Sequence, residues 1–173
     1  MIRNHRSSSG KFKARSVARG KRVPRPTAID LFCGCGGLSL GLKDAGFSVV
    51  AAVDADALAC ATYRDNHRST LLIEKDIQDV NPADLMAELG LAEGELALLA
   101  GCPPCQGFST LRTLNGGKQI SEPMNDLVFQ FSRFIKVFKP KTVMVENVPG
   151  LASDGRLARF RSFLSGMGYK SRV

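Results

Sequence analysis

Several features that mark other classes of protein are missing from this sequence. No apolar run approaches the ~18 residues that a transmembrane helix needs, although hydrophobic residues make up 44% of the chain. No apolar stretch follows the basic N-terminus, so we expect no secretory signal. The five cysteines are an odd number, which favours reduced thiols in the cytoplasm over a disulfide framework.

Acidic residues are absent from positions 1–26, which hold nine of the 24 lysines and arginines. The other positions carry fifteen basic side chains against sixteen acidic ones, so the net charge of +8 belongs to the N-terminal segment. We expect residues 1–26 to form a disordered basic tail. Such a tail either attracts DNA phosphates in a salt-dependent way, remains a solvated leader with no dedicated role, or acts as an organellar transit peptide.

From Thr27 onward, segments typical of strands alternate with segments of helical periodicity. Strands are predicted at 27–32, 48–53, 70–73, 95–100 and 141–145, with the opening of a sixth strand at 169–173. Helices are predicted at 38–45, 55–66, 82–89, 125–138 and 156–167. This alternation predicts an α/β fold that is Rossmann-like and doubly wound, with a mostly parallel sheet and helices on both faces.

A glycine-rich turn, DLFCGCGG at residues 30–37, follows the first predicted strand. Its glycines let backbone amides approach a ligand closely. Asp54 ends the second strand, where an acid typically binds ribose hydroxyls, and Asp76 follows the third, where it could receive an adenine amino group. Ser39 stands where a dinucleotide fingerprint needs glycine, and Asp30 suits a cationic sulfonium better than a phosphate. The alternative is a plain strand-to-helix turn.

Two further loops follow the fourth and fifth predicted strands. They read GCPPCQGFS at 101–109 and ENVPG at 146–150. Because the carboxyl ends of parallel strands meet at one edge of the sheet, Cys105 and Glu146 are expected to face the same crevice. A thiolate there is a strong nucleophile once its pKa falls, and a carboxyl in a partly dry cleft can hold or give a proton near neutral pH.

The motifs DLFCGCGG, PPCQGFS and ENVPG, in this order and at these strand ends, resemble the signature motifs of the DNA (cytosine-5) methyltransferases. The resemblance runs from about Thr27 to Val173. It implies the fold of S-adenosylmethionine-dependent methyltransferases and the transfer of a methyl group to carbon-5 of cytosine in double-stranded DNA, after base flipping. Such enzymes occur in restriction–modification systems, so we expect a cytoplasmic protein, associated with the nucleoid if the source is bacterial.

The resemblance also implies roles for individual residues. Cys105 would attack carbon-6 of the flipped cytosine, while Glu146 would contact ring N3 and the exocyclic amine. Gln106 and Ser109 would belong to a mobile lid on the DNA side, although an ordinary long surface loop is the alternative. The implied cofactor-binding residues are Phe32, Gly34, Gly36, Gly37, Asp54, Asp76, Ile77 and Leu127.

The cysteine spacing permits two other functions. Cys102 and Cys105 form a C-x-x-C pair, as in redox dithiols or zinc sites. Cys33 and Cys35, within the glycine turn, form a C-x-C pair. Zinc is disfavoured because both histidines are remote in the sequence, so we expect no metal. A redox role is disfavoured because it leaves Asp54 and the ENVPG motif unexplained.

Complete family members that resemble this chain would add a Gln-x-Arg-x-Arg segment, a target-recognition region and a C-terminal stretch. We therefore expect residues 27–173 to be a partial catalytic domain. Three interpretations follow. The chain is a fragment that is inactive alone, which we favour, or one subunit of a split enzyme that needs a complementary polypeptide, or a degenerate module that binds cofactor or DNA without catalysis.

Overall fold

The computed structural model describes residues 24–104, 127–153 and 155–173, of which 128, 152 and 153 by their backbone alone. None of the helices in these ranges has the length and apolar character that a membrane span requires. In chain order, the elements are β1 (Thr27–Leu31), α1 (Gly37–Asp44), β2 (Ser48–Asp54), α2 (Ala57–Asn66), β3 (Leu71–Glu74), η1 (Ile77–Asp79), α3 (Pro82–Glu88), β4 (Leu98–Gly101), α5 (Leu127–Phe138), β5 (Thr142–Val145), η3 (Pro149–Ser153) and α6 (Gly155–Gly166).

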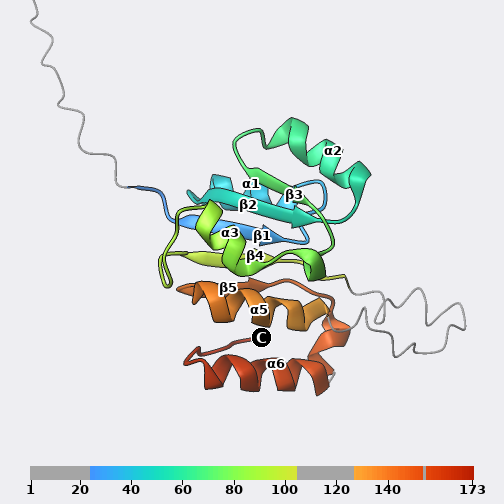
Figure 1. Cartoon of the computed structure of the whole chain (residues 1–173). Coiled ribbons are helices and arrows are strands. Elements are labelled where there is room, and N and C mark those ends of the chain that lie inside the picture. The colour runs from blue at the N-terminus through green and yellow to red at the C-terminus, as the bar shows by residue number, and fades with distance from the viewer. Residues whose placement is uncertain (1–23, 105–126, 154) are drawn as a thin grey trace, which may run out of the picture.

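The strands form one parallel sheet in the order β3-β2-β1-β4-β5 (Figure 1). In the central strand, Leu31 pairs with Val53 of β2 on one side and with Gly101 of β4 on the other. The chain moves outward from β1 to β3 and then returns to β4, so the strand order reverses beside β1. The carboxyl ends of the strands leave room for a ligand at such a point. The predicted doubly wound fold is confirmed.

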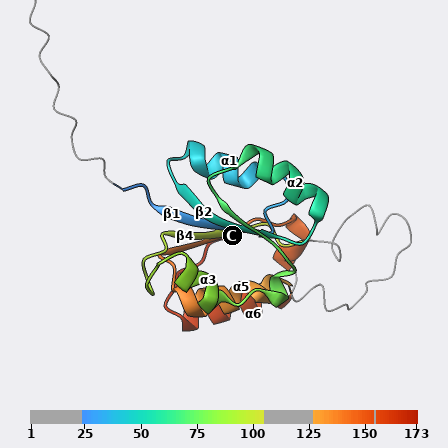
Figure 2. The same ribbon diagram turned by 45° about the horizontal axis from the view of Figure 1, so that its top comes forward.

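Helices cover both faces of the sheet: α1 and α2 lie on one face, and α3, α5 and α6 on the other (Figure 2). The alternation of β1 gives the faces different chemistry. Ile29 and Leu31 join the apolar core on the α5 side, whereas Ala28 and Asp30 face α1. The apolar stripe of α5 fills its side of the sheet with four fully buried side chains: Phe131, Phe134, Ile135 and Phe138.

A buried polar network fills part of the face beneath α1 and α2. The Ser39 hydroxyl donates to Oδ2 of Asp30 over 2.6 Å, and its oxygen lies 2.8 Å from the Tyr63 hydroxyl on α2. All three residues are fully buried. Oδ1 of Asp30 has no hydrogen-bond partner within the described part of the chain. Burial therefore raises the pKa of Asp30 from 3.8 to about 6, although the hydrogen bond from Ser39 opposes this change.

The predicted sixth strand is wrong. Residues 169–173 form no strand, because a strand exists only beside a hydrogen-bonded neighbour and this segment has none in the described sheet. The Tyr169 amide instead donates to Leu164 O at the end of α6 over 2.9 Å, and its hydroxyl donates to Pro140 O over 2.6 Å. Within the described residues, β5 is consequently an edge strand.

Strand boundaries also differ from the prediction, by one to three residues at one or both ends of each strand. β1 ends at Leu31 because Phe32 turns away from the sheet with a left-handed φ of 61°. β4 begins at Leu98 and not at Glu95. Residues 105–126, which include most of the predicted loop and the predicted start of the fourth helix, lie outside the described residues.

Asp30 should make the stability of the fold depend on pH. Because its folded pKa of about 6 exceeds the ordinary 3.8, the folded state favours the neutral carboxyl. That contribution is fully present below pH 3.8 and is lost as the pH rises through about 6. The Asp30→Asn variant imitates the neutral form, so its free energy of unfolding should exceed that of the wild type by about 3 kcal/mol at about pH 7.5 and by progressively less toward about pH 4.

Urea unfolding at both pH values measures this difference. Asp65→Asn, at an exposed acid near the end of α2, is the matched control and should show no such dependence. A difference between wild type and Asp30→Asn that stays constant with pH would contradict the effect of buried ionisation.

Candidate active site

A cavity of about 250 Å³ lies at the carboxyl ends of the strands. Part of its wall is apolar, and two of the side chains there, Ile77 and Leu127, are almost fully buried. Carboxylates from Asp54 and Asp76 add acidic groups to the same cavity. The lining residues are Phe32, Val53, Asp54, Ala55, Lys75, Asp76, Ile77, Cys102, Pro104 and Leu127. Five of the predicted cofactor-binding residues thus come together here, from the ends of β1, β2 and β3 and from the start of α5.

The glycine turn between β1 and α1 is held in a left-handed backbone. Phe32, Gly34 and Gly36 have φ angles of 61°, 51° and 95°. Glycine adopts such angles freely, but a phenylalanine does so at a cost, and residues of this kind cluster at functional sites. Gly36 caps α1, which begins at Gly37. The turn therefore exposes the Phe32 side chain to the cavity instead of continuing the strand.

Asp54 ties the glycine turn to the end of β2. Its Oδ2 accepts a hydrogen bond from the Gly34 amide over 2.7 Å, and its Oδ1 accepts one from the Asp56 amide over 2.9 Å. The Asp56 carboxylate in turn caps α2 by accepting from the Ala59 amide. Each Asp54 oxygen has a second lone pair that remains available to a hydroxyl ligand. The carboxylate is thus oriented before any ligand arrives.

The segment that follows β3 begins at Asp76 and contains η1, a single 3-10 turn that the sequence did not predict. Oδ1 of Asp76 accepts from the Gln78 amide over 2.8 Å and so starts η1. Ile77, the first residue of η1, is buried and lines the cavity. Arg133 on α5 donates to backbone carbonyls of this segment. No local pattern in the sequence indicated this role for Arg133.

His67, which directly follows α2, also supports the glycine turn, although the sequence predicted no role for it. The His67 ring packs on Tyr63, with centroids 4.4 Å apart, and its Nδ1 lies 2.9 Å from Nζ of Lys43. An ammonium donates, so Nδ1 accepts and the proton stays on Nε2. Burial and the Lys43 charge lower the pKa of His67, while its hydrogen bond to the Gly36 backbone opposes them. A Cβ on Gly36 would collide with both rings, so this position needs glycine.

The loops after β4 and β5 meet beside the cavity. The Asn147 amide group donates to Pro103 O over 3.0 Å, and the Glu146 amide donates to Gly101 O over 3.0 Å. Pro104 lines the cavity. Cys105, Gln106 and Ser109 lie outside the described residues, so the predicted approach of Cys105 to Glu146 stays a prediction.

Two described cysteines near the site are poor nucleophiles. Burial, together with a hydrogen bond and charge repulsion from Glu146, raises the pKa of Cys102 to about 12. Burial also raises the pKa of Cys33. Both therefore remain thiols at neutral pH. Among the described residues, no three histidine, cysteine, aspartate or glutamate side chains are grouped so that they could hold a metal ion.

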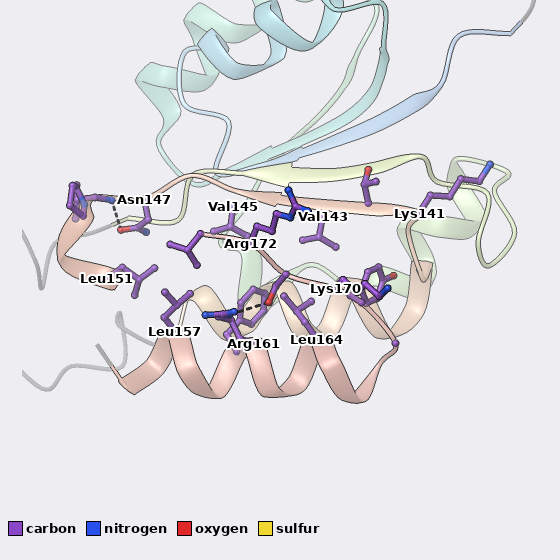
Figure 3. Close-up of a pocket in the computed structure, with 18 residues that line it drawn as sticks. Lys141, Val143, Val145, Asn147, Leu151, Leu157, Arg161, Leu164, Lys170 and Arg172 are labelled. Atoms are coloured by element: carbon purple, nitrogen blue, oxygen red, sulfur yellow. Dashed lines mark hydrogen bonds between the residues drawn. The ribbon is translucent and has the colours of Figure 1, made fainter. Parts of the chain in front are cut away.

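A second cavity of about 510 Å³ lies between the edge strand β5 and α6. Val143 and Val145 point into it from β5, and Leu157 and Leu164 from α6 (Figure 3). Residues 168–173 also line it. Basic side chains gather around this apolar space: Lys141, Arg161, Lys170 and Arg172.

Comparison with known proteins gives the same family as the motifs. The family model for C-5 cytosine-specific DNA methylases matches residues 27–172. The Type II methyltransferase M.AgeI of Thalassovita gelatinovora is 41% identical over 125 residues, which are 72% of this chain and 28% of that protein. The Type II methyltransferase M.XorII of Xanthomonas oryzae is 38% identical over 142 residues, 82% of this chain and 32% of that protein. The chain thus spans about a third of the length of these curated relatives.

Solved structures resemble the described fold. A DNA modification methyltransferase encoded within a prophage (E. coli) is 31% identical with a TM-score of 0.68, over 82% of this chain and 38% of that one. The S. pombe Dnmt2 methyltransferase has a TM-score of 0.61 at 22% identity, over 85% of this chain and 42% of that one, and it supports the fold alone. With its strand-end motifs, its sheet and the match over residues 27–172, this chain belongs to the C-5 cytosine-specific DNA methylase family.

Proposed function

We propose that this chain is the cofactor-binding and catalytic part of an S-adenosylmethionine-dependent DNA (cytosine-5) methyltransferase. The observation that carries the proposal is one cavity, at the carboxyl ends of the strands, that is bordered by the glycine turn, by Asp54 and Asp76, and by the loop that leads to Cys105. In this proposal residues 27–173 are a partial catalytic domain. Residues 1–26 are a basic tail that attracts DNA phosphates, and the enzyme acts on DNA in the cytoplasm.

The chemistry of the cavity fits the proposed cofactor. Phe32, Ile77 and Leu127 offer apolar surface for an adenine ring, and Asp54 offers acceptors for the ribose hydroxyls. Asp76 is placed for the adenine amino group, and Gly34, Gly36 and Gly37 would lie along the methionine part. When bound, S-adenosylmethionine supplies an electrophilic methyl group on a sulfonium.

Cys105 and Glu146 would perform the chemistry on the base. The Cys105 thiolate forms a bond to carbon-6 of a flipped cytosine, the displaced electron pair moves to ring N3, and Glu146 gives a proton to N3. Carbon-5 then becomes an enamine carbon that can accept the methyl group. Loss of the carbon-5 proton and expulsion of the Cys105 thiolate restore the aromatic ring.

Cys105 is the better candidate of the C-x-x-C pair because of the environment of Cys102. Burial and the neighbouring Glu146 raise the pKa of Cys102 to about 12, so this sulfur keeps its proton at neutral pH. A carboxylate that hydrogen-bonds to a thiol also stabilises the protonated form. We therefore assign covalent attack to Cys105 and a structural position to Cys102.

Mechanism-based trapping tests the covalent step. The chain is incubated with S-adenosylmethionine and duplex DNA that contains 5-fluorocytosine, where the missing carbon-5 proton blocks release of the enzyme. With the missing part of the domain supplied as a complementary polypeptide, a covalent adduct is expected for wild type and for Cys102→Ser, and none for Cys105→Ser. Glu146→Gln should slow adduct formation by about 10²–10⁴-fold, because it removes the proton donor.

The outcome separates the three interpretations of the chain. An adduct with the chain alone supports a catalytic domain and contradicts the interpretation as a fragment that is inactive alone, whereas an adduct that appears only after a complementary polypeptide from the same source is added supports a split enzyme. Cofactor binding with no adduct in either case contradicts the catalytic proposal and favours a non-catalytic module. An adduct that persists in Cys105→Ser contradicts the assignment of the nucleophile.

The cavity beside β5 favours completion of this domain by a further polypeptide segment. The Thr142 amide donates to Ala97 O just before β4, and the Glu146 amide donates to Gly101 O at its end. By strand alternation, the amides of Val143 and Val145 therefore face the open edge. The adjacent cavity is apolar and has a basic rim. We propose that an extended apolar segment with acidic flanks, from a polypeptide that carries the recognition region, pairs with β5 and fills this space.

Val143→Pro tests this docking. Proline removes one edge donor without disturbing the pairing of β5 with β4, since edge strands tolerate proline where the amide faces outward. The variant should bind S-adenosylmethionine as wild type does, yet lose about tenfold or more in affinity for the complementary polypeptide. Val143→Ala keeps the donor and is the control. Equal affinity of Val143→Pro and Val143→Ala in a titration would argue against strand pairing at this edge.

A further inference from the structure

We infer that Arg133 on α5 is a positioning residue that sets the preference of the cofactor site for adenine by clamping the segment 76–80. This inference rests on the proposed function of the cavity. The Arg133 guanidinium donates from Nη1 to Ile77 O over 3.2 Å and to Gln78 O over 3.3 Å, and from Nη2 to Val80 O over 2.9 Å. Arg133 itself does not line the cavity, so it acts through the backbone that it holds.

The clamped segment has little internal support. η1 is a single turn of three residues, and its hydrogen bonds run from the Asp79 amide to Asp76 O over 3.0 Å and from the Val80 amide to Ile77 O over 3.3 Å. Short 3-10 turns have poor hydrogen-bond geometry and leave terminal carbonyls without partners. The guanidinium donates to three carbonyls of this segment at once, from two nitrogens in one rigid plane, whereas an ammonium presents all of its donors from a single atom.

The clamp connects two walls of the same cavity. Ile77 contributes its side chain to the cavity and its carbonyl to Arg133, and Leu127 lines the cavity from the start of the same helix. Six residues of α-helix separate Leu127 from Arg133, about 9 Å along the axis. α5 is anchored in the core by its fully buried phenylalanines, so it provides a fixed platform for the segment.

The guanidinium is itself oriented by its own helix. Nη1 also donates to Oε1 of Gln130, one turn earlier, over 2.8 Å. This contact restricts the rotation of the long side chain, so less entropy is lost when the three carbonyl bonds form. Gln130 thus supports the clamp by holding the guanidinium in place.

The consequence concerns which base the cavity accepts. Asp76 opens the segment, and its carboxylate is the group that we place against the adenine amino group. If the segment is fixed, that acceptor stands at one position and a ligand without the amino group leaves it unpaired. If the segment is loose, the acceptor can turn to water, and the preference for adenine over hypoxanthine falls.

Isothermal titration of S-adenosylhomocysteine and S-inosylhomocysteine tests the inference without any methyl transfer. Wild type should prefer the adenine ligand. Arg133→Met should lower that preference by about tenfold, and Arg133→Lys should behave like Arg133→Met because the charge alone cannot replace the fork. Asp54→Asn should weaken both ligands equally, because the two ligands share the ribose.

The control for general loss of stability is Phe134→Leu, which removes packing volume from the same helix but leaves the clamp in place. It should lower the melting temperature and keep the wild-type preference. A wild-type preference in Arg133→Lys or in a folded Arg133→Met would overturn the inference. If the wild-type chain binds neither ligand, the proposed cofactor site itself fails, and that result is distinct from a failure of the clamp.

Discussion

The amide of Gly34 needs an acceptor, and the Asp54 carboxylate meets that need over 2.7 Å. The left-handed turn takes this amide out of both β1 and α1, and an unpaired backbone donor in a half-buried place is costly. Because Asp54 is the last residue of β2, one hydrogen bond fixes the turn, the start of α1 and the rim of the cavity together. The same carboxylate oxygens remain available to a ligand, so support of the fold and binding use one group.

The two faces of the sheet are stabilised by different means. The α5 face relies on aromatic and aliphatic burial, where each large side chain contributes about 1.5–3 kcal/mol. The α1 face contains the buried chain of hydroxyls from Ser39 and Tyr63 to Asp30, with one carboxylate oxygen unpartnered among the described residues. A buried polar atom without a partner costs about 1–3 kcal/mol. The unpartnered oxygen lowers the stability of the face that carries the glycine turn, as is common where a binding site constrains the sequence.

The cofactor cavity and the cavity beside β5 lie on different parts of the sheet and depend on different elements. The first uses the ends of β1, β2 and β3 and the start of α5, and its walls are tied to one another by hydrogen bonds within the described residues. The second borders an edge strand whose outward amides have no strand beside them in the part of the chain that the structure describes. The curated relatives are about three times as long as the matched region.

The sequence by itself determined the elements of the fold and the places where chemistry gathers. Apolar patterns are local, so they located five strands and their helices, and the strand-end rule then brought Asp54 and Asp76 to one edge. Glu146 followed from the same rule. The resemblance to the cytosine-5 methyltransferases added Phe32 and Ile77. Cys105 lies outside the described residues, so its approach to Glu146 is still a prediction.

Only the tertiary structure decided which distant side chains support that edge. The contacts of Arg133 with segment 77–80, of His67 with the glycine turn and of Asn147 with Pro103 join residues 31 to 56 positions apart. No pattern along the chain encodes such pairs, because they depend on how helices pack against the sheet. The predicted strand at 169–173 failed for a related reason: a strand needs a neighbour, and the presence of a neighbour is a property of the assembled sheet and not of the segment.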